Sequence, residues 1–295
     1  MAVDRRTFLK TSAGAAAAVT LSGNPTGMTA QAAGEAHSYA EYLTGLGYQG
    51  IAPADLITGH NFNGGLSYDE SHDYHRKAPG GEPEKWFVLQ NCARLDDIAK
   101  RNERGVLAYF HILGCVNNTP DHPGEVLQQV LAFLLGQAKL IPERLFVVAT
   151  EHADPYLERV ESAAVAKEQI VTRPFDEAHA TGDGSGYFRP DGHPTGPELH
   201  SLSLHYVPPG IDIGTEHKYP LPDHLEIGEF LFRPKNKPGS AVEMFSLGVE
   251  RLAMAQGTSA GDFETSRKRL LASLEKEAGR KNVALPKAYH DFSAL

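Results

Sequence analysis

Strand-like segments of this sequence come in blocks rather than in regular alternation with helices. Apolar stretches rich in β-branched and aromatic residues predict strands over residues 85–95, 105–114, 144–150, 201–207, 225–232 and 241–247. Helical spacing of apolar residues predicts helices over 38–47, 125–140 and 249–255, and an amphipathic closing helix over 263–280. A doubly wound parallel sheet needs a helix between successive strands, which several of these strands lack. The order therefore predicts an α+β fold with an antiparallel sheet flanked by helices.

The first 33 residues differ in character from the rest. Arg5 and Arg6 precede an apolar run of small residues, 13–21, and an Ala-Gln-Ala-Ala stretch follows at 30–33. These features are typical of a twin-arginine signal peptide, a route that carries proteins out of the cytoplasm after they have folded. We predict a signal peptide over residues 1–33 and one domain over 34–295, with a helical tail from about 263, working in the periplasm or outside the cell. A basic surface helix, in a cytoplasmic protein, is the alternative.

Charge and cysteine content limit the partners of this chain. Its formal net charge is −9, and no basic stretch follows the signal, which disfavours general nucleic-acid binding. No apolar run after residue 21 reaches the roughly 18 residues of a membrane-spanning helix, so we expect no membrane span. Cys92 and Cys115 could form one disulfide in an exported protein, but their surroundings predict two free, buried thiols.

Several segments resemble, in order and spacing, the catalytic core of alanyl-tRNA synthetases, a class II family. Residues 225–232 and the Gly-Val-Glu-Arg of 248–251 resemble a buried strand and the Gly-Leu-Glu-Arg helix start that follows it in that family. Residues 90–98 and 108–114 resemble the strand–loop–strand that precedes them, and weaker matches at 42–66, 196–200 and 261–265 extend the likeness over residues 40–265. The resemblance implies a class II synthetase-like fold. It also implies an enzyme that uses ATP and Mg²⁺ to activate an amino acid, or a related small carboxylic acid, as its adenylate.

The same resemblance implies which side chains would hold ATP. Arg94 would bind the α-phosphate and the attacking carboxylate, because arginine stays charged as the pentavalent phosphorus develops. Arg251 would stack on adenine and approach the γ-phosphate, with Phe110 on the opposite ring face. Asp97 would orient Arg94 or the adenine amino group. Simpler interpretations stay open: a surface arginine paired with a neighbouring acid, plain sheet core for Phe110, and a solvated loop acid for Asp97.

The substrate side departs from the family pattern. Met244 stands where the family binds the substrate amino group with an aspartate, so the nearby Glu243 becomes the candidate. Glu229 replaces a small or amide residue against the substrate, and His111 replaces a glutamate beside the adenine site. Glu198 and Glu243 are available as partial Mg²⁺ ligands. A changed substrate is therefore expected. The family's tRNA-recognition and editing segments find no match, so tRNA is not expected as a partner without a separate recognition domain, and the acceptor would be another molecule.

Three other functions fit parts of the sequence. An exported binding protein that has lost adenylation would suit the scarcity of ATP outside the cytoplasm. The Gly-x-Ser-x-Gly pattern around Ser259 matches a hydrolase nucleophile elbow, but that turn needs a preceding strand where a helix is predicted. Fourteen histidines leave an exported metal-dependent enzyme open. His72 and His75 are a weak pair, and the sequence has no His-Glu-x-x-His or Cys-x-x-Cys spacing.

Overall fold

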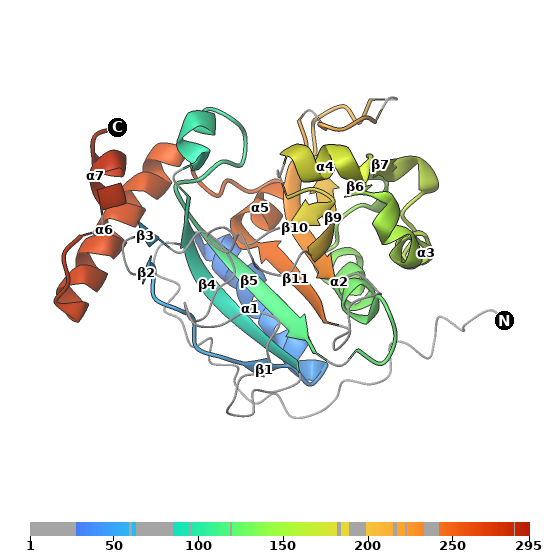
Figure 1. Cartoon of the computed structure of the whole chain (residues 1–295), viewed down its shortest axis with the longest axis horizontal. Coiled ribbons are helices and arrows are strands. Elements are labelled where there is room, and N and C mark those ends of the chain that lie inside the picture. The colour runs from blue at the N-terminus through green and yellow to red at the C-terminus, as the bar shows by residue number, and fades with distance from the viewer. Residues whose placement is uncertain are drawn as a thin grey trace.

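One large sheet organises the chain (Figure 1). The computed structural model describes residues 28–58, 61–62, 85–94, 96–118, 120–181, 184–188, 199–214, 217–221, 223–232, 242–285 and 287–295. The strand order is β1-β4-β5-β11-β10-β9-β6-β7, with β8 paired to β9. The central strands are β4 (Lys85–Ala93), β5 (Tyr109–Asn117), β11 (Glu243–Gly248), β10 (Leu225–Phe232), β9 (Leu199–Tyr206) and β6 (Leu145–Ala149). The edges are formed by β1 (Gln49–Gly50), β7 (Ile170–Thr172) and β8 (Tyr187–Phe188).

All pairs among the six central strands are antiparallel, and the parallel pairs β1·β4 and β6·β7 lie at the two edges. Of the neighbouring strands β4, β5 and β11, only β4 and β5 are close in sequence. Strand β11 comes from near the other end of the chain and inserts between β5 and β10. The prediction of an α+β fold with an antiparallel sheet flanked by helices is confirmed. A separate short pair, β2 (Ile57–Thr58) and β3 (Asn61–Phe62), lies beside the main sheet.

Helices cover one face of the sheet and bury the main core. The helices α1 (Ala30–Gly45), α2 (Glu125–Gly136), α3 (Asp154–Ser162) and α5 (Val249–Ala255) all contribute to this core. Because strand residues alternate between faces, Phe87, Leu89, Phe245 and Leu247 point into it. Burial of this apolar area, at about 25 cal/mol per Å², is the main term that holds the helices on the sheet. We call the other side, lined by Trp86, Val88, Cys92, Ile112, Val116, Leu199, Leu231, Val242 and Met244, the open face.

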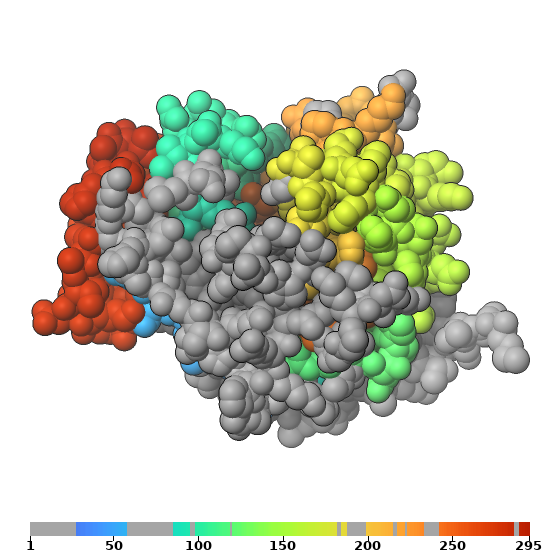
Figure 2. Space-filling model, viewed as in Figure 1, coloured from blue at the N-terminus to red at the C-terminus, as the bar shows by residue number. Residues whose placement is uncertain are grey.

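Two terminal helices close one end of the sheet. In α6 (Phe263–Lys281), the side chain of Asp262 accepts the backbone N–H of Thr265 at 2.7 Å, an N-cap that satisfies one of the first-turn donors. Phe263, Leu270 and Leu274 pack on the segment before β5, and α7 (Lys287–Ser293) packs on α6. Figure 2 shows α6 and α7 beside the connection from β4 to β5 at one end, with α3 and α4 (Phe175–Thr181) at the other.

Element boundaries differ from the sequence expectations at several places. β5 begins at Tyr109 rather than at 105, because residues 101–105 form turns. A 3-10 helix, Asp96–Lys100, lies within the connection that was expected to be a polar loop. The first helix begins at Ala30 rather than at 38, with Thr29 as its N-cap. No helix in the described ranges is long and apolar enough to cross a bilayer.

Candidate functional site

Two of the residues expected to bind nucleotide meet on the open face. Arg94 follows the last residue of β4, and Phe110 is the second residue of β5, where it pairs with Cys92. The Arg94 guanidinium carbon lies 5.2 Å from the centroid of the Phe110 ring, a cation–π contact. Arg94 is exposed, whereas Phe110 is half-buried and packs against the apolar residues of the open face. The pair forms a cationic and aromatic surface where β4 ends and β5 begins.

Arg251 lies at the same end of the sheet, in the first turn of α5. Gly248, which precedes α5, pairs with Ile112 two residues along β5 from Phe110. The Arg251 Nε–H donates to the Gly105 carbonyl at 3.1 Å, and Nη1 donates to the Glu226 carbonyl at 3.1 Å and approaches Glu226 Oε2 at 3.4 Å. Arg251 therefore ties the start of α5 to β10 and to the β4–β5 connection.

Gly105 allows the connection between β4 and β5 to approach β10 and α5 closely. Its φ is +77°, in the left-handed region, and a Cβ there would lie 2.7 Å from Leu225 Cδ2. Only glycine fits both requirements, so its carbonyl can reach Arg251. The sequence pattern indicated Arg251 but not its partner Glu226, which is the second residue of β10 and has no distinguishing feature beyond its charge.

Asp97 lies in the 3-10 helix that follows β4, three positions after Arg94. Only its backbone placement is described, so its expected role stays a prediction from the sequence. Glu198 and the pair His72 and His75 lie outside the described residues.

Glu243 lies on the helix-covered side of the sheet and is buried at 2% exposure. Its Oε1 accepts the backbone N–H of Gly124 at 2.5 Å, and its Oε2 accepts that of Val126 at 3.0 Å. These are donors at the start of α2, which Gly124 cannot cap with a side chain. Desolvation raises the pKa of Glu243, and the two N–H donors act in the opposite direction. The structure thus gives Glu243 a capping role, away from the open face where a substrate or Mg²⁺ was expected to meet it.

Glu229 lies on the open face in a row of small polar residues. Across neighbouring strands it pairs with Ser246 of β11 and with Ser203 of β9, and Ser246 pairs with Gly114 of β5. Since Gly114 is four residues beyond Phe110 in β5, the row lies about 13 Å along the sheet from the Arg94–Phe110 pair. Gly184 also lies close to Glu229, since a Cβ built on Gly184 would be 3.7 Å from Glu229 Oε1.

His111 lies on the side of the sheet opposite to Phe110. It is therefore not beside the expected adenine site, where the sequence had placed it. It is fully buried, and its Nδ1 lies 2.5 Å from Oε1 of Glu250, the second residue of α5. The Glu250 Oε2 also accepts the backbone N–H of His111 at 2.9 Å. Residue alternation along β5 separates His111 from Phe110, a consequence that the sequence interpretation overlooked.

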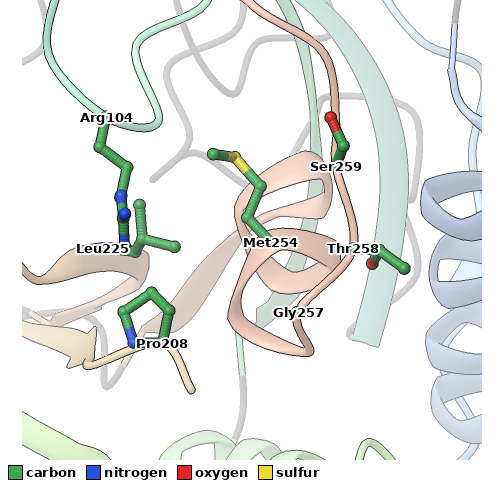
Figure 3. Close-up of a pocket in the computed structure, with 7 residues that line it drawn as sticks. All are labelled: Arg104, Pro208, Leu225, Met254, Gly257, Thr258 and Ser259. Atoms are coloured by element: carbon green, nitrogen blue, oxygen red, sulfur yellow. The ribbon is translucent and has the colours of Figure 1, made fainter. Parts of the chain in front are cut away.

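A pocket of about 340 Å³ opens beside α5 and is lined by Arg104, Pro208, Leu225, Met254, Gly257, Thr258 and Ser259. Figure 3 shows Arg104, Leu225 and Pro208 on one side of it, with Met254 on α5 and Ser259 on the loop that follows α5. Ser259 is exposed and is preceded by the end of a helix, so the strand that a nucleophile elbow needs is missing there. Within the described ranges, no group of three or more His, Cys, Asp or Glu side chains is placed to hold a metal ion.

Both cysteines are free and buried, as predicted. Cys92 belongs to the open-face cluster, whereas Cys115 packs in the helix-covered core, where its Sγ lies 3.5 Å from the Tyr39 hydroxyl. Burial raises the pKa of each thiol to about 12. The sheet separates the two sulfur atoms.

The solved structures that align with this chain include aminoacyl-tRNA synthetases. The apo histidyl-tRNA synthetase of S. aureus aligns with a TM-score of 0.45 at 13% identity, over 80% of this chain and 70% of that one. The aspartyl-tRNA synthetase of Entamoeba histolytica aligns with a TM-score of 0.42 at 13% identity, over 76% of this chain and 54% of that one. This chain therefore spans between about half and 70% of the lengths of these two proteins.

No curated protein matches the sequence. Residues 2–22 match the family of TAT (twin-arginine translocation) pathway signal sequences. The chain thus carries a signal for export by the twin-arginine route, as Arg5 and Arg6 predicted.

Proposed function

We propose that this chain is an exported, ATP-dependent ligase-like enzyme that activates an amino acid, or a related small carboxylic acid, as its adenylate. The observation that carries the proposal is the Arg94–Phe110 pair on the open face, at the end of the sheet where Arg251 lies in the first turn of α5. A planar cation and an aromatic ring, side by side and accessible, suit a nucleotide base and its phosphates. The order of these residues along the chain matches the order in alanyl-tRNA synthetases, which supports the same proposal.

In this reaction a carboxylate oxygen of the substrate attacks the α-phosphorus of ATP. A new acyl–oxygen–phosphorus bond forms, the bond to the bridging oxygen breaks, and pyrophosphate leaves with the electron pair. Arg94 swings from the Phe110 ring to the α-phosphate, which frees the ring face for adenine. Its fixed charge stabilises the additional negative charge of the transition state without exchanging a proton. Arg251 holds the distal phosphates and Asp97 orients Arg94 or the adenine amino group.

Mg²⁺ bound together with ATP would supply positive charge that offsets the charge of the phosphates, but Glu243 does not fit as its ligand. Both Glu243 oxygens accept backbone N–H groups of α2, and the residue lies on the helix-covered side of the sheet. No step of the proposed reaction is therefore assigned to a metal held by Glu243.

Glu229 is the proposed contact for the substrate amino group. It is half-buried, lies between Ser246 and Ser203, and faces the same side of the sheet as Phe110. A carboxylate flanked by small hydroxyl residues can accept hydrogen bonds from an ammonium group while leaving room for it. The distance of about 13 Å along the sheet from Phe110 suits a substrate bound beyond the phosphates.

The test is amino-acid-dependent exchange between ATP and labelled pyrophosphate, screened over the twenty amino acids. We expect Arg94→Ala to lower the exchange rate at least about 100-fold, or about 2.7 kcal/mol, the loss typical of one transition-state donor. Arg280→Ala is the matched control, because Arg280 is an exposed arginine paired with Asp55, and neither residue belongs to the proposed site. Unchanged exchange in Arg94→Ala would remove Arg94 from the reaction.

An exported binding protein is the second candidate. It is favoured by the contacts of Arg251, which is held by protein oxygens of Gly105 and Glu226. Titration calorimetry separates the two functions: a binding protein would take up ATP or an acid with no pyrophosphate exchange for any of the twenty amino acids.

A further inference from the structure

A buried acid–histidine pair joins β5 to α5 directly beneath the proposed nucleotide site. Glu250 is 4% exposed and His111 is fully buried. The two Glu250 oxygens bind one residue: Oε2 accepts the backbone N–H of His111 at 2.9 Å, and Oε1 lies 2.5 Å from its Nδ1. Contact through both backbone and side chain leaves the carboxylate little freedom to slide along the strand.

The hydrogen bonds indicate which His111 ring nitrogen faces the carboxylate. Nδ1 points at Glu250 Oε1, so a proton on Nδ1 donates to the carboxylate. In the described part of the chain, the other ring nitrogen, Nε2, is buried and has no hydrogen-bond partner. Both contacts of the Glu250 carboxylate are therefore made with one residue, through its backbone N–H and its ring.

Each member of the pair is next in sequence to a residue of the proposed site. His111 follows Phe110, whose ring points to the open face because side chains alternate along β5. Glu250 precedes Arg251, whose guanidinium leaves α5 for Gly105 and Glu226. A shift of α5 along β5 would move Arg251 relative to Phe110, and the Glu250–His111 contact opposes that shift.

We propose that Glu250 and His111 form a positioning pair that fixes Arg251 relative to Phe110 for nucleotide binding. The inference rests on the proposed function, since it concerns the geometry of the same site. A buried carboxylate is costly in itself, and an apolar pair of similar volume often replaces such a contact without loss of stability. Orientation of the two neighbours gives the pair a role that packing alone does not require.

The first experiment separates orientation from stability in the full-length chain. Glu250→Leu alone leaves His111 Nδ1 without its acceptor and lowers the melting temperature. In the double variant Glu250→Leu/His111→Leu, we expect the melting temperature to recover only in part, because the backbone N–H of residue 111 still lacks its acceptor. The KM for ATP in pyrophosphate exchange should stay raised about 10-fold or more. The KM for the amino acid should change less than about threefold, because Glu229 lies along the sheet from the pair. Recovery of both stability and KM in the double variant would overturn the proposal.

The matched control is Glu125→Gln, a buried carboxylate that also accepts a backbone N–H and a side-chain donor, but at the start of α2. It should lower stability while leaving the KM for ATP unchanged. An equal rise of this KM in the control would show that any loss of stability acts on nucleotide binding, and would overturn the positioning role.

A second measurement does not depend on catalysis. Hydrogen–deuterium exchange of the amides of β5 and α5 reports whether the pair couples these elements. In Glu250→Gln, which keeps one acceptor oxygen, we expect the His111 amide and the amides of α5 to exchange faster together by about 10-fold or more. Faster exchange of the His111 amide alone would overturn the inference. A parent protein with this coupling but without pyrophosphate exchange would contradict the proposed function and leave the coupling of β5 to α5 standing.

Discussion

At the scale of single residues, charge does not reveal which side of a strand a residue faces. Glu229 and Glu243 both stand in buried strands near the proposed site, yet Glu229 faces Ser246 and Ser203 on the open face and Glu243 caps α2 beneath the sheet. The assignment depends on the strand bounds, because a shift of one residue exchanges the faces.

Replacement of Glu243 tests the capping role. Glu243→Ala leaves the N–H groups of Gly124 and Val126 unpaired and buried, so we expect the free energy of unfolding to fall by about 2 kcal/mol. Denaturant titration measures this change. Pyrophosphate exchange per folded molecule should stay within about threefold of the parent; loss of exchange at unchanged stability would return Glu243 to the substrate site.

Glu125 gives a prediction for acid stability. Desolvation acts to raise its pKa, but hydrogen bonds from Lys85, Asp121 and Gln129 outweigh it, and the pKa is lowered. A carboxyl whose folded pKa lies below its unfolded value, about 4.3, contributes stability above pH 4.3 that is lost as the pH falls through the folded pKa. Unfolding free energies of the parent and of Glu125→Gln, measured between pH 7 and pH 3, should therefore converge at the acid end. A gap that stays constant with pH would contradict this contribution.

At the scale of elements, the sequence predicted the long central strands and missed the short ones. An apolar stretch of eight or nine residues is enough to define β4 or β10, whereas β1, β7 and β8 have only two or three residues and no readable pattern. The start of β5 was placed too early because residues 105–108 continue the apolar run. Val106 and Ala108 instead pack with α6 as irregular backbone before the strand. The first helix was placed too late, because residues 30–33 were attributed to the signal.

That helix leads to a prediction about processing. Ala32 and Ala36 are fully buried in the main core, Met28 packs against it, and the Thr29 hydroxyl accepts the N–H of Ala32 at 3.2 Å. Loss of residues 1–33 would remove this cap and the first turn of α1. We expect a chain that begins at residue 34 to be less stable by about 1–2 kcal/mol than one that begins at 28, as measured by thermal unfolding. Equal stability would support a domain boundary at 33.

At the scale of the whole molecule, the order of the strands in the sheet brings the site residues together, and local sequence patterns do not reveal that order. Arg94 and Phe110 are close because β4 and β5 are neighbours along the chain, and the resemblance found them. Arg251 and Glu226 reach this end only because β11 inserts between β5 and β10. The Glu250–His111 contact spans 139 residues of sequence and depends on the same insertion, so local pattern could not predict it.

The two cysteines report whether this sheet unfolds as one unit. Cys92 and Cys115 are buried in different clusters on opposite sides of the sheet, with thiol pKa values raised to about 12. Thiolate is the reactive form, so both should resist a thiol reagent at pH 8 in native buffer. In mild denaturant, we expect both to react at one rate, because the two clusters share the strands of one sheet and should unfold cooperatively. Mass spectrometry of alkylated peptides measures each rate, and faster labelling of Cys92 would show that the open face separates before the helix-covered core.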